Sequence, residues 1–167
     1  MDQTRERRLR ELSSAHVGAV GDYVRRRLAP LDSAALDDVI EETLLVVWRR
    51  LDEVPVGSER AWIIGVARHI LQNTKRSWFR RHAAESRVQA PLLLASAEDQ
   101  MVATLSLREA LAQLTDEDRD VLLMKVWDGL SNEEIAVTIS LSVGAVAVKL
   151  SRAQAKLREL LAEVEVR

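Results

Sequence analysis

Residues 130–158 combine helix-capping groups with a row of cations, and this combination suits contact with a nucleic-acid duplex. Ser131 and Glu134 have the spacing of a capping box, which predicts that a short helix begins at this point. Ser140 and Ser142 bracket a turn, and Ser142 is placed to cap a second helix. The segment therefore predicts two helices joined by a tight turn.

The second of these helices is predicted to be amphipathic. Its expected apolar face carries Val143, Val146, Leu150, Ala153 and Leu157. Its cations point elsewhere and are Lys149, Arg152, Lys156 and Arg158. A helix-turn-helix whose second helix offers cations to DNA fits this pattern. The alternative is a helical hairpin with a solvated basic face.

The paired carboxylates Glu41 and Glu42 suggest acid–base chemistry, but adjacent helical residues diverge by about 100° and cannot share one site. The chain has no cysteine, and its three histidines lie far apart in the sequence. No Gly-rich phosphate loop or nucleophile–base arrangement is present. We therefore expect no enzyme activity, no cofactor and no metal site.

Composition predicts a cytoplasmic protein with two kinds of partner. The 167 residues are 47% apolar and lack cysteine, which fits a reducing compartment. No apolar run is long enough to span a membrane, and the charged N-terminus is no secretory signal. The net charge is -2, yet residues 31–60 sum to -5 and residues 61–87 to +5. An acidic stretch followed by a basic one recurs in the second half of the chain, where residues 108–137 sum to -5 and residues 138–167 to +2.

Almost the whole chain is predicted to be helical. Before the helix-turn-helix we expect helices at about 5–28, 33–51, 58–81, 98–114 and 116–127. Asp32 or Ser33, Ser58 and Thr115 are the expected caps, and Gly129 is expected to end the last of these helices. The second and third helices are expected to bury, respectively, Leu36, Ile40, Leu44, Val47 and Leu51, and Trp62, Val66 and Ile70. Residues 84–97 have no clear period and contain Pro91, so they are predicted to be a linker.

Two stretches of the chain resemble a known family. Asp37 to Arg49 (DDVIEETLLVVWR) and Arg60 to His69 (RAWIIGVARH) resemble region 2 of the extracytoplasmic-function (ECF) sigma factors, a subfamily of the sigma-70 family. Ala110 to Leu122 and the helix-turn-helix resemble region 4 of the same family. The likeness covers roughly residues 16–83 and 105–162, in the family's order.

The resemblance implies an all-α fold of two small helical domains. Residues 1–83 would form region 2, a bundle of three to four helices, residues 84–97 the linker, and residues 98–167 region 4. It implies a transcription initiation factor that binds the RNA polymerase core, through the clamp helices and flap, and promoter DNA. An anti-sigma factor is a further expected partner. Two alternatives are a degenerate sigma-like interaction module with weakened DNA reading and a DNA-binding regulator that acts without polymerase; the acidic second helix argues against the latter.

The resemblance also assigns site residues. Core binding falls to Asp38, Glu41, Glu42, Thr43 and Trp48 on the second helix. Recognition of the minus-ten element falls to Arg68, His69, Asn73, Lys75, Arg76 and Arg80 on the third helix. The loop 52–59 would hold a flipped base. Trp62 is expected in the core, whereas Trp78 is a candidate for exposure near DNA.

Recognition of the minus-thirty-five element falls to the second helix of the helix-turn-helix. The residues so assigned are Ser142, Gly144, Ala145, Val148, Lys149, Arg152 and Lys156. Here the chain departs from the family, which commonly has Thr, Lys, Ser and Arg at positions 145 and 147–149 and a basic residue at 154. Minus-thirty-five binding is therefore expected to be weak or to use methyl contacts. Leu44 and Val54 also replace the aromatic residues that are usual at their positions.

Overall fold

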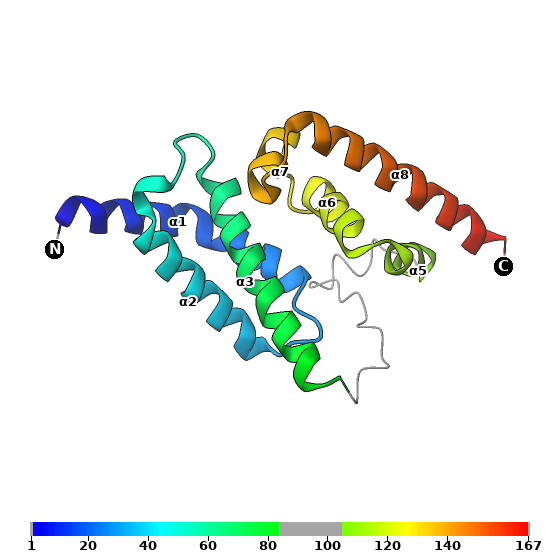
Figure 1. Ribbon diagram of the computed structural model, residues 1–167, viewed down its shortest axis with the longest axis horizontal. Helices are drawn as coiled ribbons and strands as arrows, with labels where there is room; N and C mark the ends of the chain where they lie inside the picture. Colours follow the sequence, from blue (N-terminus) through cyan, green and yellow to red (C-terminus); the bar gives the residue numbers. More distant parts are fainter. Residues whose placement is uncertain (1, 84–104, 167) are drawn as a thin grey trace. The chain divides into compact units, whose positions relative to one another are not determined.

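The protein consists of two compact helical units, Met1–Ala90 and Pro91–Arg167. The computed structural model describes residues 2–83 and 105–166, and within this part of the chain every regular element is a helix (Figure 1). The expected all-α fold is confirmed. The predicted linker at 84–97 lies outside the described residues, so its boundaries stay a prediction.

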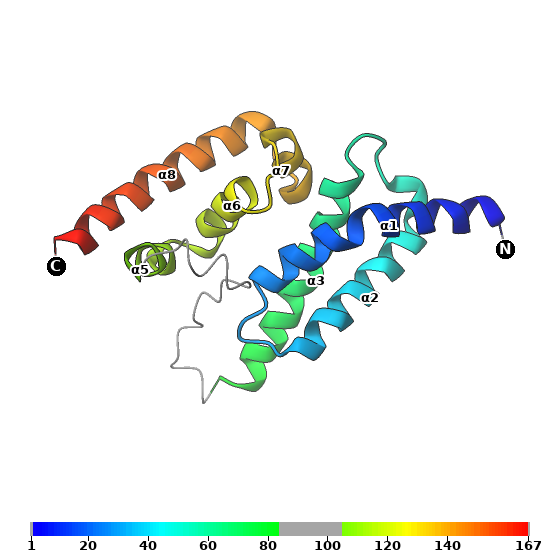
Figure 2. The same ribbon diagram turned by 180° about the vertical axis from the view of Figure 1, so that it is seen from behind.

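The first unit is a bundle in which each of three long helices packs against the other two (Figures 1 and 2). The elements are α1 (Gln3–Arg26), α2 (Ser33–Arg49), the short 3-10 helix η1 (Leu51–Glu53) and α3 (Glu59–Arg81). Asp32 caps α2 by accepting a hydrogen bond from the backbone N–H of Ala35 at 3.1 Å, as the sequence predicted.

The predicted buried faces of α2 and α3 are each rotated from the observed ones. α2 buries Val39, Thr43 and Val47, whereas Leu36, Ile40 and Leu44 are only half-buried. α3 buries Ala61, Ile63, Ile64, Ala67, Ile70 and Leu71. Because α2 and α3 each pack against two neighbours, the buried arc is set by helix crossing as well as by the apolar stripe. Trp62 and Val66 consequently lie at the edge of the core, and the prediction of a core position for Trp62 was wrong.

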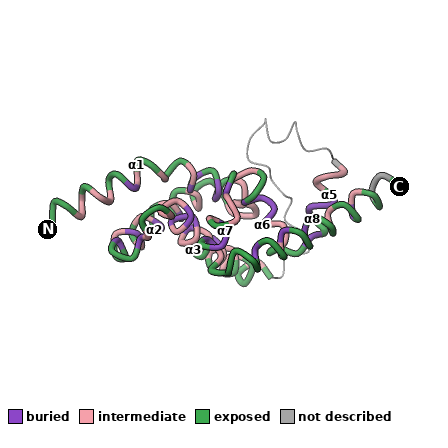
Figure 3. The backbone as a smooth tube through the Cα atoms, turned by 90° about the horizontal axis from the view of Figure 1, so that it is seen from above, coloured by how far each residue is buried: buried purple, intermediate pink, exposed green. Residues whose placement is uncertain are grey.

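The second unit is built around its last helix. Its elements are α5 (Leu105–Gln113), α6 (Asp116–Val126), α7 (Asn132–Ile139) and α8 (Val143–Glu165). α8 packs against each of the other three and alternates buried and exposed positions along its length (Figure 3). Residues 98–104, where the fourth helix was predicted to begin, lie outside the described residues.

Side chains cap α6 and α7 as predicted. The Thr115 hydroxyl accepts from Asp118 N at 3.2 Å, and Ser131 and Glu134 form the predicted capping box. Gly129 follows α6 with φ of +66°, a conformation that favours glycine. The ends of these helices are thus fixed by local sequence.

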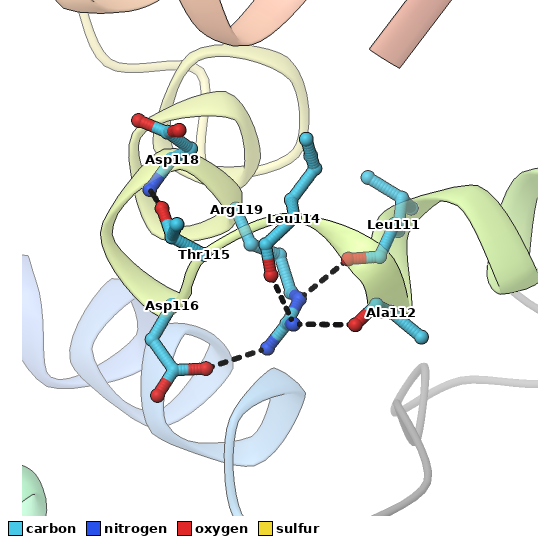
Figure 4. A network of polar contacts seen from close by, with 7 residues as sticks. All are labelled: Leu111, Ala112, Leu114, Thr115, Asp116, Asp118 and Arg119. Atoms are coloured by element: carbon cyan, nitrogen blue, oxygen red, sulfur yellow. Dashed lines mark hydrogen bonds and ion pairs between the residues drawn. The ribbon is translucent and has the colours of Figure 1, made fainter. Parts of the chain in front are cut away.

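Arg119 joins α5 to α6 (Figure 4). Its guanidinium donates to the carbonyl oxygens of Leu111 at 2.8 Å, Leu114 at 3.0 Å and Ala112 at 3.2 Å. It also pairs with the exposed carboxylate of Asp116 at 3.1 Å. These carbonyls lie in the last turn of α5 and at Leu114 just after it, and the Leu111 oxygen also accepts from the backbone N–H of Leu114 at 3.3 Å. Arg119 therefore caps the C-terminal end of α5 from the next element.

No single helix in the described parts of the chain is long and apolar enough to cross a membrane, although the bent pair α7–α8 meets that test on length and composition alone.

Candidate functional site: three helical surfaces

α2 carries an acidic surface on the side opposite its buried residues. Asp38, Glu41 and Glu42 are all exposed, and their spacing places them around one side of the helix. Val39, Thr43 and Val47 face the bundle instead. We call the exposed side, formed by Asp38, Glu41, Glu42 and Leu45, the acidic face.

Thr43 does not belong to this acidic face. Its side chain is 1% exposed, and its hydroxyl donates to the Val39 carbonyl oxygen at 2.6 Å within the same helix. Thr43 lies on the arc occupied by Val39 and Val47, so the expectation of a surface role for it was wrong. A threonine hydroxyl can be buried in a helix because it satisfies its own hydrogen bond in this way.

Trp48 lies at the flank of the acidic face and is half-buried. The Arg5 guanidinium of α1 stands over its ring at 5.4 Å from the centroid and donates to the Trp48 carbonyl oxygen at 3.2 Å. Arg5 also pairs with Asp52. Trp48 is thus part of the α1–α2 contact.

Leu45 was missed by the sequence reasoning and lies within the acidic face. It is 53% exposed and follows Glu41 by four positions, one helical turn. Glu41 and Glu42 lie one turn before it, so Leu45 gives the acidic face an apolar end beside its carboxylates. The sequence did contain a sign of this exposure, because Leu45 is not among the residues of the predicted apolar stripe, 36, 40, 44, 47 and 51.

α3 carries a row of exposed polar and cationic side chains that we call the basic stripe. Its members recur at intervals of four, three and four residues and are His69, Asn73, Arg76 and Arg80. Arg76 donates to the Asn73 side-chain oxygen at 2.9 Å, so neighbouring members interact. Arg68 and Lys75 are half-buried and lie off the stripe. The structure therefore brings together four of the six residues assigned to this helix.

Aromatic rings lie along the same helix. Trp62 precedes His69 by seven positions, which places it on the face of the basic stripe, and the Arg50 guanidinium covers its ring at 5.3 Å. Trp78 is half-buried and stacks on the His82 ring at 4.1 Å between centroids. Trp62 was thus placed on the wrong side by the sequence reasoning.

The loop 52–59 presents Val56 and buries Val54. The Val54 carbonyl oxygen accepts from Arg8 at 3.2 Å, and its side chain lies in the core, whereas Val56 projects from the loop. Gly57 has φ of +86°. Hydrogen bonds from the backbone N–H groups of Glu59 and Gly57 hold the pKa of the Glu59 carboxyl below its ordinary value. The loop is therefore tied at both ends and exposes its middle.

α7 and α8 form the predicted helix-turn-helix. The chain bends by 101° between them, and Ser140 in the turn has a left-handed φ of +56°. The Ser142 hydroxyl accepts from Ala145 N at 3.1 Å and so caps α8, as predicted. This bend lies within the range that helix-turn-helix motifs show.

The start of α8 has an exposed apolar side. Val146, Leu150 and Ala153 are buried as predicted, but Val143 is exposed and was wrongly assigned to the buried face. We call the exposed residues Gly144, Ala145, Ala147 and Val148 the methyl face. Arg152 and Lys156 are exposed one and two turns farther along.

Lys149 lies next to the methyl face but is engaged inside its own unit. Its ammonium nitrogen is 2.8 Å from the Glu117 carboxylate of α6, and the lysine side chain is 26% exposed. The two residues are 32 positions apart, so periodicity within one helix gave no sign of the pair. Lys149 is therefore directed across to α6.

The described residues contain no group of three or more His, Asp or Glu side chains arranged to hold a metal ion.

Comparisons with known proteins identify the class to which these surfaces belong. Residues 104–157 match the family model Sigma-70, region 4. The chain is 31% identical over 163 residues to the ECF RNA polymerase sigma factor SigL of Mycobacterium tuberculosis, covering 95% of this chain and 91% of SigL. It is 30% identical over 175 residues to the RNA polymerase sigma factor CnrH of Cupriavidus metallidurans, covering 90% and 91% of the two chains.

Solved structures with the same fold are also sigma factors. CnrH, in complex with the cytosolic domain of CnrY, matches with a TM-score of 0.60 at 23% identity over 95% of this chain and 90% of CnrH. RpoE from Bartonella quintana, in complex with the anti-sigma factor NepR, matches with a TM-score of 0.58 at 20% identity over 96% and 98% of the two chains. At these identities the likeness concerns the fold.

The helix-turn-helix, the region 4 match and the relatives over nearly the full length define a bacterial sigma factor of the sigma-70 type. The chain belongs to the ECF RNA polymerase sigma factors. It binds the RNA polymerase core and promoter DNA and directs promoter-specific transcription initiation.

Proposed function

We propose that the three surfaces divide the work of this sigma factor. The acidic face of α2 binds the clamp helices of the polymerase largest subunit, the basic stripe of α3 binds the minus-ten element, and α8 enters the major groove at the minus-thirty-five element. Contact of the second unit with the polymerase flap completes the assembly. The family resemblance of these segments is the starting point, and the exposure of the side chains supports it.

The strongest support for this proposal comes from the acidic face of α2. Exposed carboxylates can form bidentate pairs with arginines of a partner helix, and Leu45 supplies apolar area beside them. No residue of the acidic face forms part of the bundle core. Its side chains are therefore available to a partner without unfolding the unit.

The basic stripe has the composition needed for a DNA strand. Arg76 and Arg80 can neutralise phosphates, and Asn73 and His69 can reach base edges. Trp62 lies on the same side of α3, with the Arg50 guanidinium 5.3 Å from its ring centroid, and adds apolar area beside the stripe. Val56 projects from the loop 52–59 assigned to a flipped base, and it is the residue of this loop that we expect to meet that base.

Charge reversal on the acidic face tests the core-binding assignment. We expect Glu41→Lys with Glu42→Lys to abolish co-purification with polymerase core while the helix content stays unchanged. The matched control is Glu109→Lys with Glu163→Lys, which alters the net charge equally at two exposed sites of the second unit. Unchanged core binding by the first variant contradicts the assignment, and a loss of helix content gives the two residues a structural role.

We also propose that the two units are joined through a linker at about 84–97, with region 2 at 1–83 and region 4 at 98–167. Pro91 and the loss of periodicity support this division. Limited proteolysis should cut first between Ala83 and Ala97 and leave two stable fragments. A first cut inside residues 33–51 or 116–127 contradicts it.

An anti-sigma protein is the regulatory partner we propose. Of the solved relatives, RpoE is bound to an anti-sigma factor and CnrH to a cytosolic domain, which supports the same kind of partner for this chain. We infer a cytoplasmic location, where polymerase and DNA are found, and action through binding with no catalysis or cofactor of its own.

A further inference from the structure

We propose that the methyl face of α8 reads thymine by its C5 methyl group, so that the upstream promoter element is recognised through apolar contact. This inference rests on the proposed placement of α8 in the major groove. It goes further by naming the chemical group on the DNA and the side chains that meet it.

The composition of the first turns of α8 carries the argument. Between Ser142 and Ser151 the only charged residue is Lys149, and its ammonium pairs with Glu117 at 2.8 Å. The Ser142 hydroxyl accepts from Ala145 N in its capping role. The other exposed side chains of this stretch, those of Val143, Ala145, Ala147 and Val148, end in methyl groups.

Val148 is the centre of this face. It lies about 140–160° around the helix from the buried Val146, Leu150 and Ala153, and its exposed fraction is 50%. Gly144 precedes it by one turn and adds no side chain, which lets the helix approach the base edges closely. Ala145 lies beside it on the same end of the helix.

Charge complementarity selects DNA as the occupant of this apolar surface. Arg152 and Lys156 are exposed one and two turns beyond Val148, where they can hold phosphates of the groove wall. In the major groove thymine alone among the four bases presents a methyl group, and alanine and other small apolar side chains are its usual contacts. The methyl face and the adjacent cations therefore match a groove rich in thymine.

Deoxyuridine substitution isolates the methyl group, because uracil keeps every hydrogen-bonding group of thymine. Holoenzyme reconstituted from polymerase core and the full chain is titrated by fluorescence anisotropy against a duplex promoter fragment taken from a selected library. Each upstream thymine is replaced in turn by deoxyuridine. We expect one or two positions at which affinity falls about fourfold.

Variants and a second base test the same contact independently. In Val148→Ala holoenzyme the difference in affinity between the thymine and uracil fragments should shrink at the sensitive position, because the two γ-methyl groups that project farthest are lost. Val166→Ala, the same change at an exposed position beyond the far end of α8, should retain the full difference. At that position 5-methylcytosine should bind more tightly than cytosine, since it restores the methyl group alone.

Three outcomes overturn the proposal, and they differ. If base-pair substitutions upstream change affinity but uracil never does, α8 reads hydrogen bonds or DNA shape, and its proposed position in the groove survives. If no upstream substitution and neither Arg152→Ala nor Lys156→Ala has an effect, the minus-thirty-five role of α8 fails as well. If Val148→Ala instead converts a sedimenting dimer to a monomer, a second copy of the chain covers this face.

Discussion

α3 and α8 are the two long helices that we assign to DNA, and they distribute their chemistry differently. On α3 the cations and the polar groups share one stripe, so Asn73 lies one turn from Arg76 and accepts a hydrogen bond from it. On α8 the methyl face and the cations Arg152 and Lys156 occupy successive stretches of the helix. On α3 the residues proposed to bind phosphates and those proposed to select bases therefore share one stripe. On α8 the two kinds of residue lie on different stretches, so mutations can alter one without the other.

Replacing Arg119 should have the largest effect on the difference between the two helices. Arg119 joins α5 to α6, against which α8 packs, whereas α3 belongs to the other unit. Arg119→Ala removes the guanidinium donor from three carbonyl oxygens at and just after the end of α5, of which only that of Leu111 keeps a backbone donor among the described contacts, and we expect the second unit to lose ~2–4 kcal/mol of unfolding free energy. Urea unfolding followed by Trp127 fluorescence measures this, with Trp48, Trp62 and Trp78 replaced by Phe in both proteins compared.

Asp116→Asn is the control for that experiment. It removes only the exposed ion pair of Arg119, whose carboxylate side chain is 97% exposed, so the change should stay below ~1 kcal/mol. Equal destabilisation by the two variants would assign the stability to the ion pair instead of the carbonyl cap.

Removing cations from the basic stripe should produce the next largest effect. We expect Arg76→Ala with Arg80→Ala to weaken holoenzyme binding about uniformly across promoter sequences and to lower the slope of log affinity against log salt by ~2. The measurement is a salt titration between about 50 and 200 mM, the range over which such contacts are well resolved. Arg7→Ala with Arg10→Ala, two exposed cations of α1, should leave the slope unchanged.

A promoter library sharpens the comparison at the level of bases. Polar side chains that pair with a base edge discriminate by ~1–3 kcal/mol, whereas a methyl contact is worth ~0.8 kcal/mol. We therefore expect transcription by reconstituted holoenzyme to place more sequence information in the minus-ten element than in the minus-thirty-five element. Information concentrated upstream would reverse this ranking.

Releasing Lys149 from its ion pair with Glu117 should have the smallest effect. It should make α8 more like α3 by placing a free cation beside the methyl face. Glu117→Gln removes an exposed carboxylate from the lysine, so stability should change by less than ~1 kcal/mol. The salt slope should rise by up to ~1 as the ammonium turns to a phosphate. Lys149→Ala in the Glu117→Gln background should return the slope to its starting value, and an unchanged slope in both variants would show that Lys149 does not reach DNA.

The sequence predicted helix ends better than helix faces, for a physical reason. The caps at Asp32, Thr115 and Ser131 each bond to a backbone N–H three residues away, so their signals are complete within a short window. The side of a helix that is buried depends on how it crosses its neighbours. Thr43 and Trp62 were therefore assigned to the wrong faces, although both helices were located correctly.

The contacts that could not be predicted from the sequence join residues of different helices. Lys149 meets Glu117 across 32 positions, and Arg119 reaches back to the end of the preceding helix. In a sequence both cations look like ordinary surface charges. The family resemblance pointed to the helices that we assign to DNA but gave no sign that Lys149 is engaged with α6.

The division of α8 into a buried side and an outward side bears on how this protein can change over generations. Val146, Leu150 and Ala153 hold the helix to its unit, while Ala147, Val148 and Gln154 are exposed. Substitutions at exposed positions usually alter stability by no more than ~0.5 kcal/mol. A lineage can therefore exchange the outward residues one at a time, and acquire new promoter preferences, without passing through variants that fail to fold.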